Sequence, residues 1–151
     1  MRRVTVVAIA MLFMLGTVAW SAEHVIMEPK DLQWEDVSAL PQGAKVALIE
    51  GPMDQATPFI IRFKFPADFK IPAHWHPNIE HVTVLSGALN LGVGDKLDPA
   101  KTHVIPAGGV GIMPAKTNHF AWTKEETVVQ VHGMGPWGVT FVDPADDPRK
   151  K

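Results

Sequence analysis

Two histidines and a glutamate lie close together in the segment His74–Glu80, which reads HWHPNIE. Side chains alternate between the two faces of an extended chain, so His74 and His76 are expected to point to the same side. Glu80 follows a bend at Pro77, and its spacing lets it return to that side. Two imidazoles and a carboxylate that converge from neighbouring backbone form a mixed nitrogen and oxygen site, which suits a divalent transition metal ion.

A fourth ligand has to come from elsewhere in the chain, and His119 is the best candidate. It opens a predicted strand directly after a turn at residues 114–118. The sequence contains no cysteine, which excludes thiolate sites and stabilisation by disulfide bonds. Three histidines and one glutamate suit Fe, Mn, Cu, Zn, Ni or Co, so the residues leave the identity of the metal open.

The elements that must position these residues are short and extended. Thirteen prolines and twelve glycines divide the sequence into brief segments, and Phe59–Phe65 (FIIRFKF) alternates strongly between apolar and polar residues. Many short strands with closely spaced turns predict an all-β sandwich or barrel. We expect strands at 45–50, 59–65, 73–76, 79–85, 88–93, 103–105, 110–113, 119–122, 127–132 and 138–142, with a short edge strand at 24–27 that continues at 31–34.

The histidine-rich segment resembles the first motif of the cupin superfamily, G-x5-H-x-H-x3-E-x6-G. His74, His76, Glu80 and Gly87 occupy the motif positions with every spacing kept. Asp68 replaces the leading glycine of the motif, and this departure touches none of the candidate ligands.

A second stretch resembles the second cupin motif, G-x5-P-x-G-x2-H-x3-N. Gly108, Pro114 and His119 match it, whereas Lys116 replaces a glycine and Thr123 replaces an asparagine. The resemblance implies a single cupin-type antiparallel β-barrel, or jelly roll, with a metal ion inside its mouth. The metal ligands that it implies are His74, His76, Glu80 and His119.

The same alternation of side chains suggests which residues line the pocket beside the metal. Val82 and Val84 share the side of Glu80 and are expected to give the cavity an apolar lining. Gln130 and His132 share a side of a later strand, and both would line the pocket if that side is internal. His81 lies on the opposite side to Glu80, so we expect it to face away from the metal.

The first residues differ from the rest and have the layout of a secretory signal peptide at residues 1–22. Arg2 and Arg3 precede an apolar run, Val4–Val18, and small residues follow it. The alternative is an uncleaved membrane anchor, but the run is shorter than the roughly 20 residues that a spanning helix needs. We therefore expect an exported protein, periplasmic or secreted, with no stable membrane span after cleavage. Beyond the signal we expect an N-terminal arm with edge strands at 23–44, the cupin barrel at 45–142 and a surface tail at 143–151.

Composition narrows the function classes. The formal net charge is −2 and the body of the chain has no basic run, which argues against nucleic-acid binding. Two classes remain open. One is a metal-dependent enzyme acting on a small organic molecule, of the dioxygenase or the isomerase or lyase type, and the other is a non-catalytic envelope protein that binds a metal or a ligand. The resemblance also implies a homodimer formed through outer strands, for which the apolar strand Phe59–Phe65 is a candidate.

Overall fold

The computed structural model describes residues 24–151, so the predicted signal peptide at residues 1–22 lies outside the described residues. Strands and short 3-10 helices (η) make up its regular structure, and no helix in residues 24–151 is long and apolar enough to cross a membrane. The elements are η1 (Pro29–Asp31), β1 (Glu35–Asp36), β2 (Lys45–Glu50), β3 (Pro58–Phe65), β4 (Lys70–Trp75), β5 (Glu80–Ser86), β6 (Ala88–Val93), η2 (Pro99–Lys101), β7 (His103–Pro106), β8 (Val110–Met113), β9 (His119–Thr123), β10 (Thr127–Met134), β11 (Thr140–Phe141), η3 (Pro144–Asp146) and η4 (Pro148–Lys150).

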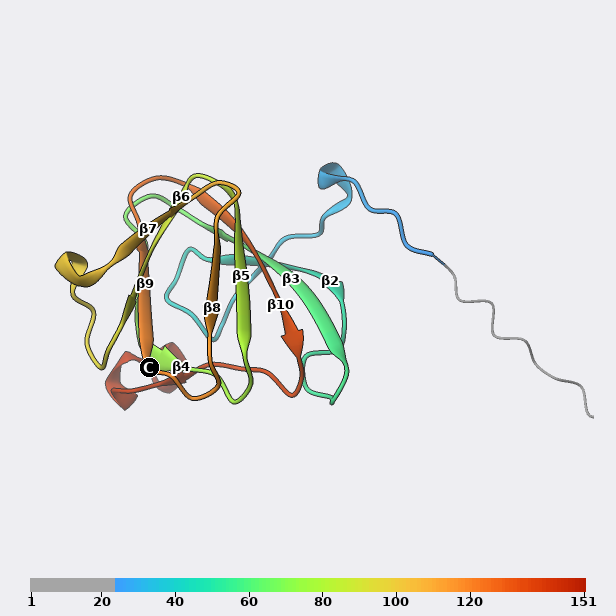
Figure 1. Cartoon of the computed structure of the whole chain (residues 1–151). Coiled ribbons are helices and arrows are strands. Elements are labelled where there is room, and N and C mark those ends of the chain that lie inside the picture. The colour runs from blue at the N-terminus through green and yellow to red at the C-terminus, as the bar shows by residue number, and fades with distance from the viewer. Residues whose placement is uncertain (1–23) are drawn as a thin grey trace, which may run out of the picture.

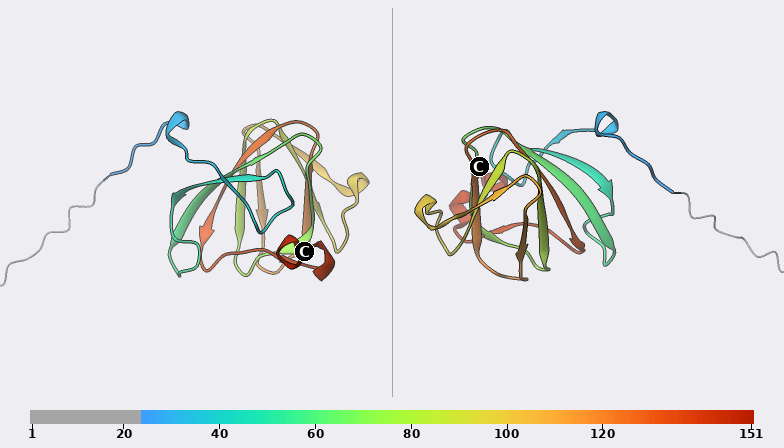
Figure 2. Two further views of the ribbon diagram at one scale, coloured as in Figure 1. Left: turned by 180° about the vertical axis from the view of Figure 1, so that it is seen from behind. Right: turned by 45° about the horizontal axis from the view of Figure 1, so that its top comes forward.

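The strands form two antiparallel sheets that enclose a common interior (Figures 1 and 2). The first sheet has the order β1-β2-β3-β10-β5-β8, and the second has the order β11-β4-β9-β6-β7. Successive strands often lie in different sheets. For example, β3 and β5 belong to the first sheet, whereas β4, between them in the sequence, belongs to the second. This arrangement confirms the predicted all-β jelly roll.

Strand β3 shows how the sequence pattern builds the interior. Its phenylalanines at 59, 63 and 65 and Ile61 face inward and are at most 8% exposed, whereas the intervening side chains face the other way. Burying a side chain of this size contributes roughly 1.5–3 kcal/mol. The strict alternation therefore fixes the register of β3 against β2 and β10, because a slip by one residue would expose all four side chains.

The position of β3 also bears on the predicted homodimer. β3 lies between β2 and β10, so it has no free edge for pairing with another copy of the chain. Its phenylalanines are buried, and its outward side chains are Ile60, Arg62 and Lys64. This strand therefore does not offer the apolar surface that the sequence suggested.

The predicted edge strand at 24–27 and its continuation at 31–34 are wrong. Residues 24–28 form no regular structure, the helix η1 follows them, and the first strand is the two-residue β1. Pro29 has no N–H to donate to a ladder, and Glu28 caps η1 instead. Val25 and Ile26 remain 74% and 84% exposed, and the arm extends away from the sheets in both views of Figure 2.

Thr123, where the second cupin motif has an asparagine, ties strand β9 to the turn before β4. Its hydroxyl donates to the carbonyl of Pro66 (2.7 Å) and accepts from the N–H of Phe69 (3.3 Å). The side chain is 1% exposed, so water cannot replace either partner. The threonine thus holds the turn that leads into the histidine-bearing strand.

We expect Thr123→Val to lower the free energy of unfolding by about 2 kcal/mol, because two buried backbone groups lose their partner. Thr123→Ser keeps the hydroxyl and loses one methyl group, which should cost only about 0.8 kcal/mol. Urea denaturation of the three proteins measures the difference. An equal loss in both variants would show that the hydroxyl does not contribute.

Candidate metal centre

The ends of three strands and the turn after one of them bring the predicted ligands together. His74 lies near the end of β4, His76 follows that strand, Glu80 begins β5 and His119 begins β9. His74 and His119 are register partners across the β4–β9 ladder. One ligand nitrogen from each of the three histidines lies within 4.8 Å of the others, and all three residues are buried. The structure therefore gathers the histidines from both cupin motifs at one point.

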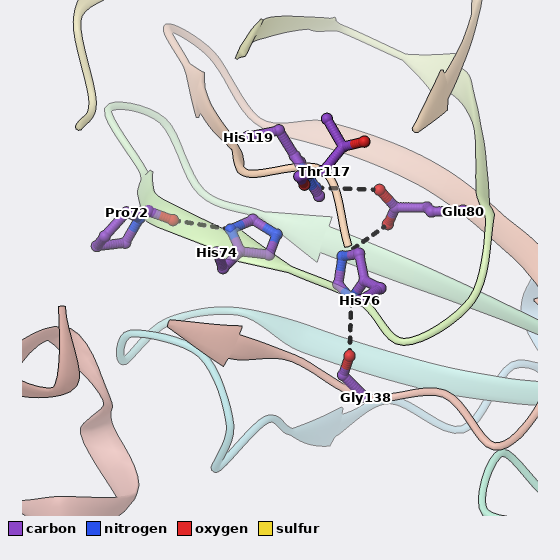
Figure 3. Close-up of polar contacts among 7 residues, drawn as sticks. All are labelled: Pro72, His74, His76, Glu80, Thr117, His119 and Gly138. Atoms are coloured by element: carbon purple, nitrogen blue, oxygen red, sulfur yellow. Dashed lines mark hydrogen bonds and ion pairs between the residues drawn. The ribbon is translucent and has the colours of Figure 1, made fainter. Parts of the chain in front are cut away.

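Each histidine is held by a hydrogen bond from Nδ1 to a backbone carbonyl. The acceptors are the carbonyls of Pro72 for His74 (2.7 Å), Gly138 for His76 (2.8 Å) and Thr117 for His119 (2.8 Å), as Figure 3 shows. A carbonyl can only accept, so Nδ1 of each ring must carry the proton. In a neutral imidazole this leaves Nε2 with a free lone pair, which is the state that ligates a metal.

Glu80 lies beside these lone pairs. Its carboxylate oxygens are 3.6 Å from Nε2 of His76 and 3.4 Å from Nε2 of His119 (Figure 3). Neither of these two nitrogens has a hydrogen-bond partner, although both are buried. The lone pairs of the two Nε2 atoms thus face the carboxylate oxygens of Glu80, and a cation between them would stabilise this arrangement.

Burial and neighbouring charges shift the pKa values of three groups in the site. Burial, followed by the neighbouring His119 and His76, lowers the pKa of His74 to about 3, and burial also lowers the pKa of His76. Burial alone would raise the pKa of Glu80, but the contact with His119 and the other imidazoles outweighs it, so the pKa lies below its usual value. For His74, His76 and Glu80 these directions favour a neutral imidazole or an ionised carboxylate, which are the forms that ligate a divalent metal.

The four side chains line one end of an internal cavity of about 290 Å³. Both sheets contribute apolar walls, among them Phe63 and Val131 from the first sheet and Leu91 from the second. The residues therefore fit a metal ion whose remaining coordination positions face the space for a small ligand. They could hold it through three nitrogens and one oxygen, a hard to borderline donor set.

The predicted pocket residues divide into two groups. Val82 lines the cavity, whereas Val84 shares its side of β5 but is fully buried in the hydrophobic core and does not line the cavity. Gln130 and His132 face the outside of β10, so the prediction that they line the pocket is wrong. The inward residues of β10 are Val129 and Val131. Gln130 instead accepts a hydrogen bond from Nε of Arg62 (3.1 Å) on the outer face.

His132 stacks against His81 on the outside of the first sheet. The ring centroids are 4.9 Å apart with an interplanar angle of 14°, and the two residues are register partners across β5 and β10. His81 therefore faces away from the candidate ligands, as its position in the sequence predicts. The pair provides two histidines outside the site that can serve as controls.

Two side chains at the site lie outside the predicted set of ligands and pocket residues, although the sequence leaves Trp137 as a residue of the core or the pocket wall. Trp137 stacks on the ring of His76 (centroids 4.3 Å apart, 17°), packs on Phe59 and lines the cavity. Arg149, from the helix η4, lines the cavity as well. The only sequence signal for Trp137 is a large aromatic residue beside the flexible pair Gly135 and Gly138, and its position depends on how the chain returns from β10 to β11.

The segment 143–151, predicted as a surface tail, is structured and reaches the cavity. Asp143 and Asp147 cap the helices η3 and η4. Asp147 is 7% exposed and binds the guanidinium of Arg149, with Nε to Oδ1 at 2.7 Å and Nη2 to Oδ2 at 2.9 Å. This ion pair is local to η4, and the hydrogen bond from Nη2 of Arg149 to the carbonyl of Val139 (3.1 Å) links the end of the chain to the segment before β11.

Both residues that replace motif glycines keep the backbone conformation of a glycine. Asp68 has a φ of 58° and Lys116 a φ of 59°, both in the left-handed region. The N–H of Lys116 donates to the carbonyl of His76 (2.8 Å), so this turn supports the backbone of a candidate ligand. The chain therefore preserves the motif geometry at a conformational cost.

We expect Lys116→Gly to raise the free energy of unfolding by roughly 0.5 kcal/mol. Relief of the left-handed conformation gains about 1–2 kcal/mol, and the greater freedom of glycine in the unfolded chain offsets about 0.5–1 kcal/mol of this. Lys116→Ala removes the same side-chain atoms beyond Cβ and should not be stabilising. Thermal denaturation compares the two, and a glycine variant less stable than the alanine variant would contradict the prediction.

No protein-family model and no curated protein matches the sequence, but solved structures resemble the fold. The polyketide cyclase RemF from Streptomyces resistomycificus aligns with a TM-score of 0.67 and 18% identity, over 85% of this chain and 92% of that one. A protein from Methylibium petroleiphilum PM1, proposed to be an acetylacetone dioxygenase, aligns with a TM-score of 0.63 and 18% identity, over 85% and 87%. An RmlC-like cupin from Ralstonia eutropha JMP134 aligns with a TM-score of 0.63 and 19% identity, over 83% and 76%.

These likenesses show that the chain has the RmlC-like cupin fold, as the two sequence motifs imply. At 18–19% identity they show the fold alone. What the protein does has to be argued from the residues of its own site.

Proposed function

We propose that the protein is a metal-dependent enzyme of the dioxygenase type that acts on a small organic molecule. His74, His76, Glu80 and His119 are the proposed ligands of one divalent transition metal ion. The observation that carries the proposal is the convergence of three oriented imidazoles and one buried carboxylate at the end of an apolar cavity. RemF and the Methylibium protein support the use of this fold for chemistry on small molecules.

Each side chain has a distinct part in this proposal. The carbonyls of Pro72, Gly138 and Thr117 hold the rings so that Nε2 points inward, and Trp137 limits rotation of His76 by stacking on it. Glu80 supplies negative charge without an intervening proton. The apolar walls exclude water from the bound molecule, which strengthens electrostatic interactions within the site. A redox-capable metal with open coordination positions would supply the oxygen chemistry, and a zinc ion would polarise a carbonyl or activate water.

The test is metal analysis of the purified protein followed by oxygen-consumption assays. Protein loaded separately with each of Fe, Mn, Cu, Zn, Ni and Co is assayed with a panel of diphenols, thiols and keto acids. Oxygen uptake with product formation for one metal and one substrate class supports the dioxygenase. Turnover without oxygen uptake would move the proposal to the isomerase or lyase type.

A second candidate is a non-catalytic protein that binds a metal or a ligand. One observation favours it. Among the cavity-lining residues that the structure describes, Arg149 is the only charged side chain besides the candidate ligands, and it is already paired with Asp147. No separate general acid or base is therefore evident, and silence of every metal and substrate combination would favour this candidate.

We also propose that the protein is exported and acquires its metal after export. The signal-like residues 1–22 support this proposal. If the chain crosses the membrane unfolded, the higher intrinsic affinity of nitrogen and oxygen sites for copper and zinc favours these two metals outside the cytoplasm. Fractionation of cells that express the full chain, with metal analysis of the fraction that holds it, tests both points, and recovery of iron or manganese would contradict the second.

A further inference from the structure

The cavity beside the metal centre is lined almost entirely by hydrocarbon. Beyond the four candidate ligands, its walls include Phe65, Leu89 and Leu91, together with Val131 and the ring of Trp137. These residues come from both sheets, so the apolar surface surrounds the space on several sides. A polar group placed among them would lose its water, and the unpaired donor that these walls hold is the buried indole Nε1 of Trp137.

The one further charge in the lining does not provide a site for an anion. The guanidinium of Arg149 binds the carboxylate of Asp147 through two contacts of 2.7 and 2.9 Å, and Nη2 also donates to the carbonyl of Val139 (3.1 Å). The Arg149 side chain is 43% exposed, which places part of it at the mouth. Because its charge is paired and solvated, it gives little attraction to a carboxylate or phosphate deeper in the cavity.

We infer that the molecule bound here has an uncharged, apolar body and a single oxygen-bearing end that faces the histidines and Glu80. The orientation of that end rests on the proposed metal site, whereas the apolar body rests on the cavity walls alone. The cavity of about 290 Å³ is larger than an engineered apolar cavity of roughly 150 Å³ that binds benzene. It therefore has room for one aromatic ring with a short alkyl chain, and it disfavours sugars and dicarboxylic acids.

Calorimetry on the metal-loaded protein in the absence of oxygen tests this substrate class. The probes are catechol and its 4-methyl, 4-ethyl and 4-propyl derivatives, which share one metal-binding end. Affinity should rise about fourfold with each added methylene group until the cavity is full. Methyl 3,4-dihydroxybenzoate should bind at least tenfold more tightly than 3,4-dihydroxybenzoate, whose carboxylate would have to be buried. The inference would be overturned if the affinity did not change along the alkyl series, or if the carboxylate bound as tightly as its ester.

A second series separates this inference from the proposed metal site. Toluene, ethylbenzene and propylbenzene carry no metal-binding group and are measured on both wild-type and His76→Ala protein. If the affinity rises with alkyl chain length in both proteins, the result supports a bound molecule with an apolar body. This holds even if catechols bind no better than hydrocarbons and the metal proposal fails. Absence of hydrocarbon binding to both proteins would overturn the inference while leaving the metal site to its own test.

A matched pair of variants locates the binding. Val131→Phe places a ring in the cavity, and Gln130→Phe places the same ring on the outer face of the same strand. Propylbenzene affinity should fall more than tenfold in a folded Val131→Phe protein and stay unchanged in Gln130→Phe. Equal affinity in both variants would place the molecule elsewhere and overturn the inference. If Val131→Phe does not fold, the inference is tested by the two series of probes on the wild-type protein.

Discussion

His76→Ala should purify with less than a tenth of the metal that the wild-type protein holds per chain. The Nε2 atom of His76 is buried without a partner, and its ring is fixed by the carbonyl of Gly138 and the stacked ring of Trp137. Losing a residue that only orients a ligand typically lowers metal affinity about 10–100-fold. Removing the ligand itself should lower the affinity at least as much, because both the donor atom and its fixed geometry are lost.

His119→Ala and Glu80→Gln test the same site from the other strands. Glu80→Gln keeps the shape of the side chain and removes its charge, so a loss of metal in this variant reports on the carboxylate and not on packing. Element analysis after dialysis measures metal per chain in each variant. The proteins are also compared by circular dichroism, so that metal loss through unfolding is recognised.

The histidine pair on the outer face supplies the matched control. His132→Ala removes the same type of side chain from β10, where it stacks on His81 and is exposed. This variant should retain the wild-type metal content. Equal metal in wild type and His76→Ala, or an equal loss in His132→Ala and His76→Ala, would contradict the assignment of the site.

Side-chain alternation is sufficient to predict which residues of β5 face the interior, because Val82 and Val84 alternate with the more polar His81 and Thr83. For β10 the same rule alone leaves two faces open, and Gln130 and His132 would line the pocket only if their face were internal. Val129 and Val131 alternate with these two residues, and their apolar character identifies the inner face. The sequence therefore carries the signal for the inner face of β10, and the two valines decide it.

The prediction failed where position depends on distant parts of the chain. Trp137 and Arg149 reach the cavity because the segment after β10 lines it at residues 137–139, pairs with β4 through β11 and continues into η4. No local pattern in a proline- and glycine-rich segment encodes that path. The arm before β1 shows the opposite error, since apolar residues at 25–27 resemble a strand but have no neighbouring edge with which to form a ladder.

Adding a divalent metal to metal-free protein should raise its unfolding midpoint by roughly 10 °C when the free metal is about 100 times the dissociation constant. At that ratio a ligand that binds only the folded state stabilises it by about 2.7 kcal/mol, which a chain of this size converts to such a shift. The site supplies a physical reason for selective binding to the folded state. Three inward Nε2 atoms and the Glu80 carboxylate are separated in the unfolded chain and are gathered only by β4, β5, β9 and the turn after β4.

Differential scanning calorimetry of chelator-treated protein, titrated with each metal in turn, measures this shift. His132→Ala should show the wild-type response, whereas His76→Ala should show little or none. A metal-dependent shift of equal size in His76→Ala would mean that the metal stabilises the protein from another position. If no metal shifts the unfolding midpoint of the wild-type protein, the four residues form a buried polar cluster that does not bind a metal. The reason is that an ion bound only to the folded chain has to stabilise it.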